Sequence, residues 1–346
     1  MRASYFITLP FRYIEYQFNR VHPLWCTFAI TENCNACCEY CQYWRKKHSD
    51  LPTESVLKVI DRLKELGIAS IAFSGGECLL RSDIVNVVSY TAKLGIQASL
   101  SSNGLICNDE LFHDLMSQGL HTLAFSLDGS NAAIHEVFRK GCDFDRVIDS
   151  IKKAVDIKKK YQFTTNIVTA TVVNKININD LQNIYRLRKS LGADKNYFQP
   201  IWPIFGEKDF DERFGFSEMG FKDLERIAEE LSNIPDGNLR KYYEIVPYLY
   251  KNFKWIPERY QCFAGRAFVY VDSSGTLFPC SPLTSQPMGS LLEENIQDVL
   301  SMPGLKSKLK NYKRFKCGGC TMSCYMEKNI LLSGIHNPFS LWKRAR

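Results

Sequence analysis

Three closely spaced cysteines, Cys34, Cys38 and Cys41, follow the apolar run 24–30 at C-x3-C-x2-C spacing. Three thiolates on one short loop can hold three corners of a 4Fe-4S cube and leave the fourth iron open, whereas an electron-transfer site closes all four corners with cysteine. An open iron can bind a substrate. The spacing therefore indicates a cluster that takes part in chemistry.

The same loop has two other interpretations. Short-spaced cysteines are also normal in zinc knuckles. Cys37 lies in the same loop, so Cys34, Cys37 and Cys41 form a second set of three thiols. The residues alone leave the choice between Cys37 and Cys38 open.

Polar motifs follow three of the predicted strands. The first is Gly75-Gly76-Glu77, in which paired glycines let a backbone approach a ligand closely and the carboxylate can accept hydrogen bonds from an ammonium group. The other two carry hydroxyl, amide and carboxylate groups that can bind a ribose diol or a carboxylate, although Asn-Gly and Asp-Gly are also common turn dipeptides. Their candidate residues are Ser102 and Asn103 after one strand, and Ser126 and Asp128 after the next.

The cysteine spacing, with Tyr40 just before the last cysteine, and the strand-end motifs resemble the radical S-adenosylmethionine (radical SAM) superfamily. In that family the open iron binds the amino and carboxylate groups of SAM. An electron from the reduced cluster then cleaves the sulfonium and releases a 5'-deoxyadenosyl radical, which abstracts hydrogen from a substrate carbon. The cofactors carry this chemistry, and the protein positions them and excludes water.

The resemblance also implies roles for single residues. It favours Cys38 over Cys37 as a cluster ligand and assigns the Gly-Gly-Glu motif to the SAM amino group. Arg139 resembles the family arginine that pairs with the SAM carboxylate, for which a planar guanidinium is better suited than lysine. Tyr40 would pack near adenine, and Ser102 stands where the family more often has threonine. A surface arginine and a core aromatic are the alternative interpretations of Arg139 and Tyr40.

A second group of cysteines lies toward the C-terminus, at Cys262, Cys280, Cys317, Cys320 and Cys324. With Gly275 in a hairpin turn between the first two, their spacing resembles the start of the SPASM and twitch auxiliary-cluster domains that follow many radical SAM barrels. A full SPASM domain uses more cysteines for two clusters, so the resemblance implies one auxiliary 4Fe-4S cluster. Cys317 and Cys324 compete for its last ligand position, and zinc on the same thiols is the alternative.

The elements that must position these residues alternate between strand and helix patterns from about residue 24 to about residue 200, which is typical of βα units around a parallel sheet. The predicted strands are 24–31, 68–74, 96–101, 121–127, 164–173 and 196–199. The predicted helices start at Thr53 as N-cap and continue at 82–94, 109–118, 145–160 and 178–191. Six strands suit an α/β partial barrel, and the resemblance adds the (β/α)6 TIM-like form, in which ligands gather at the C-terminal strand ends.

We predict four segments along the chain. They are an N-terminal extension at 1–23, the radical SAM partial barrel at 24–200, a bridging segment at 201–256 and a SPASM/twitch-like auxiliary-cluster domain at 257–346. The bridging segment is interrupted by prolines and glycines, with one helix predicted over 217–231. The last segment contains a hairpin pattern at 268–271 and 276–278.

The composition is that of an ordinary globular protein, with 346 residues of which 45% are hydrophobic and 23% charged. Thirteen cysteines bunched at short spacings favour metal binding over disulfides and predict a reducing cytoplasm. The N-terminus lacks the unbroken apolar core of a signal peptide, and no segment approaches the ~18 apolar residues of a membrane span. The net charge of +7 gives a weak preference for anionic partners, and we expect no nucleic acid.

The sequence therefore predicts a radical SAM enzyme that receives electrons from a reductant such as flavodoxin or ferredoxin. We expect it to act in the biosynthesis of a small molecule, lipid or cofactor. A peptide or protein maturase is the alternative, against which no added leader-binding domain is seen. A non-catalytic iron-sulfur electron-transfer protein is the alternative from another class. Aromatic and basic residues near both termini predict contact with a membrane surface, or else docking on their own domain.

Overall fold

The structure is a computed structural model that describes residues 12–18, 20–45, 49–201, 213–216, 221–233, 261–293, 295, 299–300, 304–313 and 322–334. Cys317, Cys320, the C-terminal aromatic residues at 339–342 and most of the bridging segment lie outside these ranges. Within the described part of the chain, no helix combines the length and the apolar character that crossing a membrane needs.

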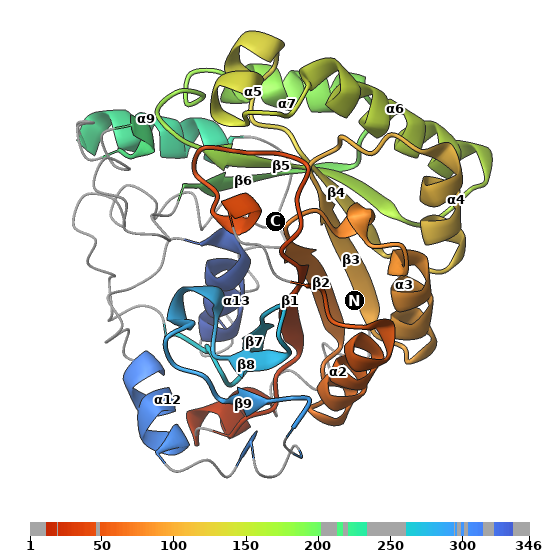
Figure 1. The fold of residues 1–346 in the computed structure, drawn as a ribbon. Helices are drawn as coiled ribbons and strands as arrows, with labels where there is room; N and C mark the ends of the chain where they lie inside the picture. Colours follow the sequence, from red (N-terminus) through yellow and green to blue (C-terminus); the bar gives the residue numbers. More distant parts are fainter. Residues whose placement is uncertain are drawn as a thin grey trace.

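A parallel sheet of six strands forms the body of the chain (Figure 1). Its strands are β1 (Trp25–Thr31), β2 (Ser70–Gly75), β3 (Gln97–Ser102), β4 (Thr122–Ser126), β5 (Asn166–Val173) and β6 (Lys195–Pro200). Each pairs in parallel with the strand before it, so their C-terminal ends meet at one edge. All six predicted strands are present, with small shifts at their ends.

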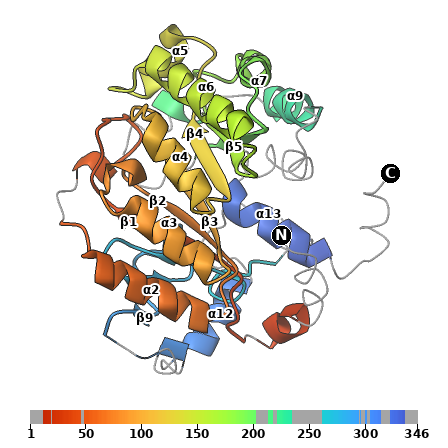
Figure 2. The same cartoon turned by 90° about the vertical axis from the view of Figure 1, so that its right-hand side faces the viewer.

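Helices cover the outer face of this sheet (Figures 1 and 2). They are α2 (Thr53–Glu65), α3 (Ile84–Lys93), α4 (Asp109–Ser117), α5 (Ala132–Phe138), α6 (Phe144–Lys160) and α7 (Leu181–Ser190), and α9 (Phe221–Ser232) follows in the bridging segment. In α2 the apolar side chains of Val56, Val59, Ile60 and Leu63 are completely buried. Each such side chain contributes roughly 1.5–3 kcal/mol through burial, which explains why the apolar spacing predicted this helix.

One expectation about the helices is wrong, and one short helix was not predicted. Thr53 is the first helical residue and not the N-cap, which is Pro52. The Thr53 hydroxyl instead donates to Asp83 Oδ2 at 2.7 Å, so a contact with another helix replaces the cap. The short helix α5 was not predicted; it starts after Asn131, whose side chain accepts from the Ile134 N–H.

The C-terminal region extends the sheet of the barrel. Strand β7 (Phe268–Val271) pairs in parallel with β1, and β8 (Thr276–Phe278) and β9 (Gly289–Ser290) follow as antiparallel neighbours. The predicted hairpin is thus confirmed, and Gly275 in its turn has φ +80°. Because β7 joins β1, the second group of cysteines is attached directly to the strand that precedes the first.

Helix α13 (Ser323–Gly334) lies on the inner side of the sheet, opposite the covering helices (Figures 1 and 2). Tyr325 stacks on Phe268 of β7 at 4.9 Å between ring centroids, and the Lys328 ammonium lies 5.8 Å from the centroid of the Trp25 ring. The basic helix α12 (Leu305–Lys313) packs outside, where the carbonyl of Lys313 accepts from the N–H of Cys262. These contacts join α13 to β1 and β7, and α12 to the chain just before β7.

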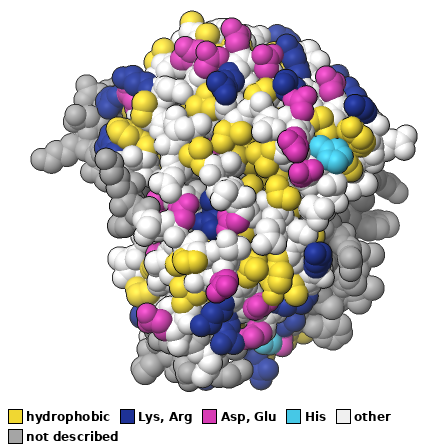
Figure 3. Space-filling view, turned by 45° about the vertical axis from the view of Figure 1, so that its right-hand side comes forward, with side chains coloured by type: hydrophobic (Ala, Val, Ile, Leu, Met, Phe, Trp, Pro, Cys, Tyr) yellow, Lys and Arg dark blue, Asp and Glu magenta, His cyan; other side chains and the backbone are white. Residues whose placement is uncertain are grey.

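The N-terminal aromatic residues that the structure describes dock mainly on their own chain. Tyr13 and Tyr16 are buried, with their rings 6.0 and 5.9 Å from that of Phe263. Phe18 is the exception, at 73% exposed. On the face that α2, α3 and α4 turn outward, basic and acidic side chains are interspersed rather than separated by sign (Figure 3).

Candidate active site

The loop after β1 brings three cysteines together. Cys38 is buried and Cys34 and Cys41 are half-buried, and all three belong to one small packed cluster with Leu105 and Cys142. A turn forms within the loop, where the Cys41 N–H donates to the Cys38 carbonyl at 3.1 Å. Burial raises the pKa of Cys41 to about 11, and the neighbouring sulfurs of Cys38 and Cys34 act in the same direction.

Cys37 points out of this cluster. Its side chain is exposed, and both its N–H and its thiol donate to the Lys140 carbonyl, at 2.9 and 3.4 Å. The geometry therefore groups Cys38 with Cys34 and Cys41, and sets Cys37 apart.

Two side chains donate to the sulfurs of the loop. Asn103 Nδ2 lies 3.8 Å from Cys34 Sγ, and Arg139 Nη1 lies 4.0 Å from Cys38 Sγ. Soft thiolates with hydrogen-bond donors at their sulfurs fit an iron-sulfur cluster. No three His, Cys, Asp or Glu side chains of the described residues are gathered as for a single metal ion; a cube takes each thiolate on a different iron, which spaces its ligands farther apart.

The glycines of the Gly-Gly-Glu motif face the cysteine loop. A Cβ added at Gly75 would lie 2.1 Å from the Thr31 carbonyl oxygen, and one added at Gly76 would lie 2.1 Å from that of Asn33. The Gly76 N–H donates to the Thr31 carbonyl at 2.8 Å, and Gly75 has φ +119°. The close approach that glycine permits is thus used by the backbone of the cysteine loop.

We expect Gly76→Ala to destabilise the protein by about 3 kcal/mol or more, because backbone atoms cannot move aside as a flexible side chain can. The matched control is Ser74→Ala on the same strand, where no methyl group is added. Urea denaturation of both variants measures the loss. A Gly76→Ala protein as stable as the Ser74→Ala protein would contradict this packing.

Glu77 ties the ends of β2 and β3 together. It is completely buried, its Oε1 accepts from the Leu79 N–H at 3.0 Å, and its Oε2 accepts from the Asn103 N–H at 2.6 Å. Burial raises the pKa of Glu77, and these backbone hydrogen bonds oppose that rise. Both oxygens are therefore engaged inside the protein and position Asn103 next to the cysteine loop.

The remaining strand-end candidates lie on the same edge. Ser102 is buried, and its hydroxyl accepts from the Gly104 N–H at 3.0 Å. Asn103 Nδ2 also donates to Asn35 Oδ1 at 2.7 Å. Ser126 is half-buried at the end of β4, in register with Ala170 of β5. The structure thus brings the C-terminal ends of β1, β2, β3 and β4, with their polar motifs, together at one edge of the sheet, as predicted.

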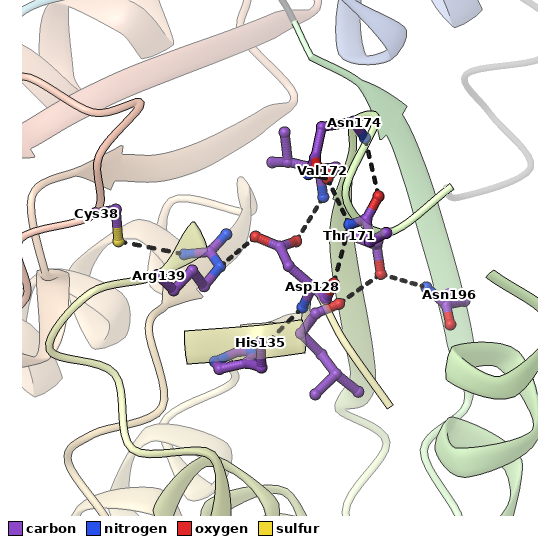
Figure 4. Close-up of polar contacts among 10 residues, drawn as sticks. Cys38, Asp128, His135, Arg139, Thr171, Val172, Asn174 and Asn196 are labelled. Atoms are coloured by element: carbon purple, nitrogen blue, oxygen red, sulfur yellow. Dashed lines mark hydrogen bonds and ion pairs between the residues drawn. The ribbon is translucent and has the colours of Figure 1, made fainter. Parts of the chain in front are cut away.

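Arg139 and Asp128 form a buried ion pair (Figure 4). Arg139 Nε donates to Asp128 Oδ2 at 2.5 Å, and the Val172 N–H donates to Asp128 Oδ1 at 2.6 Å. Burial raises the pKa of Asp128, and the Arg139 charge opposes that rise. The predicted surface alternative for Arg139 is wrong, since only 7% of this residue is exposed.

Tyr40 packs against this arginine. Its ring stacks on Phe138 at 4.3 Å between centroids, and the Arg139 Cζ lies 5.5 Å from its ring centroid. The ring thus packs the cysteine loop against the end of α5.

Two residues of the site escaped the sequence prediction. The Cys142 thiol hydrogen-bonds with that of Cys38, which lowers the pKa of Cys38, as does the Arg139 charge. His135 is completely buried, and its Nδ1 accepts from the Asp128 N–H at 3.2 Å. Each of these residues lies too far along the sequence from its partner for a short motif to include both. Only the folded chain shows these contacts.

His135 is expected to make the protein less stable in mild acid. Burial, with the Arg139 charge, lowers the pKa of His135 from 6.5 to about 3. Below pH 6.5, His135 becomes protonated in the unfolded chain but stays neutral in the folded chain. The free energy of unfolding is therefore greatest above this pH and falls toward about pH 3. The limiting slope is roughly 1.4 kcal/mol per pH unit.

Denaturation between pH 7.5 and 5.5 measures this effect against His135→Gln, with His113→Gln, at a half-buried histidine of α4, as the matched control. The wild type and the His113 variant should lose stability alike, and the His135 variant less. Equal slopes in all three proteins would contradict the prediction.

Of the second group of cysteines, the structure describes Cys262, Cys280 and Cys324. Cys262 and Cys280 are buried in the main core, and Cys324 is half-buried near the start of α13. Cys324 and Cys280 both lie close enough to the Tyr325 phenol to raise its pKa further, beyond the effect of burial. These three cysteines span 62 positions of the sequence, and they lie on neighbouring elements of one region.

Comparison with known sequences identifies the barrel. The profile described as the radical SAM superfamily matches residues 28–188. The AdoMet-dependent heme synthase of Methanosarcina barkeri is 24% identical over 352 residues, covering 92% of this chain and 96% of that protein. The probable GTP 3',8-cyclase of Saccharolobus solfataricus is 30% identical over 218 residues, covering 60% of this chain and 64% of that protein.

Solved structures share the fold. Streptococcus suis SuiB bound to its precursor peptide SuiA superposes with a TM-score of 0.68 at 17% identity, covering 86% of this chain and 69% of that chain. The structure of anSMEcpe with bound AdoMet has a TM-score of 0.63 at 18% identity, covering 88% of both chains. The profile match runs from β1 through α7 and so contains the cysteine loop and every strand-end motif. The radical SAM superfamily profile thus covers the barrel at residues 28–188, and the chain is an enzyme.

Proposed function

We propose that this enzyme reductively cleaves SAM and uses the resulting 5'-deoxyadenosyl radical to abstract hydrogen from a substrate carbon. The observation that supports the proposal is the packing of Cys34, Cys38 and Cys41 in one cluster at the C-terminal edge of the sheet, with donors at their sulfurs. These thiols would hold a 4Fe-4S cluster with one open iron. When bound, the reduced cluster supplies the electron that cleaves the sulfonium.

The chain's own residues would hold SAM at this edge. We assign the amino group to the corner built by Gly75, Gly76 and Glu77, in which the Glu77 side chain acts by fixing the backbone. Arg139 Nη2 has no hydrogen-bond partner among the described residues, and we assign this nitrogen to the SAM carboxylate. Ser102 and Asn103 line the edge, and Tyr40 would exclude water beside the thiols.

Strand β4 completes the proposed SAM site. Ser126 at its end is half-buried and available for a ribose hydroxyl. Asp128 accepts hydrogen bonds from Arg139 and Val172 through its two oxygens, so we assign it to orienting Arg139 rather than to touching SAM.

The inner face of the sheet would receive the substrate. Its side chains are small and partly exposed, in contrast to the large buried side chains that face the helices. They are Ser70, Ala72, Ser74, Ser99, Ser101, Thr122 and Ala124. Small polar side chains leave room for an organic substrate without selecting for charge.

A small molecule, lipid or cofactor is the substrate class that we favour. A relative named for heme synthesis covers 92% of this chain, and one named for a GTP cyclisation covers 60%. The second candidate is a peptide, supported by the shared fold of SuiB bound to its precursor peptide.

We further propose an auxiliary 4Fe-4S cluster on Cys262, Cys280 and Cys320, with Cys317 or Cys324 as the fourth ligand. The burial of the three described thiols in one region supports this assignment. The reductant would be a one-electron protein such as flavodoxin or ferredoxin.

Anaerobic incubation of the reconstituted, dithionite-reduced protein with SAM tests the proposed function. We expect 5'-deoxyadenosine and methionine to form slowly even without substrate. Failure to form either product, with both clusters present, would overturn the proposal.

A further inference from the structure

Arg139 and Asp128 are a fixed part of the site. Asp128 has no exposed surface and Arg139 only 7%, and their ion pair is 2.5 Å long. Removing one partner of such a pair would leave an uncompensated buried charge, which is strongly destabilising. Neither side chain can therefore leave the other without a large loss in free energy.

Asp128 is held in turn by three further hydrogen bonds (Figure 4). Its Oδ1 accepts from the Val172 N–H of β5 at 2.6 Å, and its own N–H donates to His135 Nδ1 at 3.2 Å. Its carbonyl accepts from Asn177 Nδ2 at 2.9 Å. Asp128 is thus held to β5 by its carboxylate and to α5 by its backbone. Its fixed carboxylate in turn fixes the position of the Arg139 guanidinium.

The opposite end of Arg139 meets the cysteine loop. Nη1 lies 4.0 Å from Cys38 Sγ, and Cζ lies 5.5 Å from the centroid of the Tyr40 ring. Tyr40 is supported from behind by the ring of Phe138 at 4.3 Å. The guanidinium is therefore confined between its carboxylate partner and the sulfur of a cluster ligand.

A cation fixed beside a cluster thiolate has a defined electrostatic consequence. Reduction adds one electron to the thiolate-bound iron, and hydrogen bonds to the sulfurs and local charge set the potential at which this happens. A positive charge favours the reduced state, and the effect is larger in a buried site than in water. Asp128 opposes this effect in part but also keeps the guanidinium in place.

We propose that Arg139 is a positioning residue that donates to the Cys38 sulfur and that, anchored by Asp128, raises the reduction potential of the cluster. The inference rests on the proposed function, since it needs a cluster on Cys34, Cys38 and Cys41. It adds to that function a device by which a carboxylate just after β4 and an arginine just after α5 make the bound cluster easier to reduce.

Redox titration followed by electron paramagnetic resonance, without SAM, tests the proposal. We expect Arg139→Gln to shift the cluster midpoint to more negative potential, by at least about tenfold in the ratio of reduced to oxidised cluster, or about 59 mV for one electron. Arg139→Lys keeps the positive charge but loses the planar guanidinium with its several N–H donors, and it should shift the midpoint less. The matched control is Arg188→Gln, another buried arginine, which lies in α7 and should leave the midpoint unchanged.

Asp128→Asn, alone and combined with Arg139→Gln, tests the anchor. Because the carboxylate acts through Arg139, its effect on the midpoint should differ between the wild-type and Arg139→Gln backgrounds, and purely additive shifts would remove Asp128 from the proposal.

Three results would overturn the inference. One is a midpoint that does not move in Arg139→Gln while the cluster is retained. Another is an Arg139→Gln protein that loses only the change in signal on adding SAM, which would restrict Arg139 to binding the carboxylate. If Arg139→Gln fails to fold, the double variant Asp128→Asn/Arg139→Gln replaces it, because it removes both buried charges together, and an unchanged midpoint there decides against the proposal. A wild-type protein that takes up no iron at all would instead overturn the proposed function.

Discussion

Replacing Cys38 by alanine is expected to remove one whole cluster, whereas replacing Cys37 leaves it in place. A cube that loses one of only three thiolate ligands is left with two exposed irons, so iron per chain should fall by about four. Cleavage of SAM should fall below detection. Cys34→Ala and Cys41→Ala should behave as Cys38→Ala does, because these three thiols pack in one cluster.

Cys37→Ala is the matched control for this prediction. It removes a thiol from the same loop, but one that is exposed and hydrogen-bonded to the Lys140 carbonyl. Iron and acid-labile sulfide analysis of the reconstituted variants measures the outcome. Loss of iron in Cys37→Ala with retention in Cys38→Ala would reverse the ligand assignment.

The second large effect is expected at Cys280. Cys280→Ala should lower the iron content by about four per chain while the first cluster keeps its spectroscopic response to SAM. The physical reason is that the two sets of thiols lie on different loops. Cys280 follows β8, whereas the three thiols proposed to hold the SAM-binding cluster follow β1. If the second group of thiols binds zinc instead, zinc rather than iron should be lost.

Cys26→Ala serves as its matched control. Cys26 is a buried thiol of β1 that packs in the main core, so its replacement should cost stability but no iron. Elemental analysis with electron paramagnetic resonance separates the two results. An unchanged metal content in Cys280→Ala would contradict the auxiliary cluster.

The strands and most covering helices followed from local patterns. Runs such as 68–74 and the apolar spacing of α2 predicted their elements because burial of one face decides secondary structure residue by residue. The caps were less predictable: Thr53 has the chemistry of an N-cap, but a hydrogen bond to Asp83 thirty residues away engages its hydroxyl. A tertiary contact had replaced a local one.

The strand-end motifs lie where they were predicted, but the contacts that their residues make inside the protein were not predictable. Gly75 and Gly76 stand at the predicted strand end, yet they make room for the backbone of Thr31 and Asn33. Glu77 is where a ligand-binding carboxylate was expected, yet two backbone N–H groups occupy its oxygens. The type of a residue determines what its side chain can bind. Only the fold determines which of the possible partners it contacts.

The sequence by itself determined that a loop with three spaced thiols follows a strand, and that polar motifs end the next three strands. These features are local, since the spacing of a few residues sets both loop geometry and burial. Only the tertiary structure decided that Cys38 and not Cys37 joins the other thiols, that Arg139 is clamped by Asp128, and that β7 continues the sheet beside β1. Such contacts join residues far apart in the chain, and their free energy exists only after the sheet has brought its strand ends together.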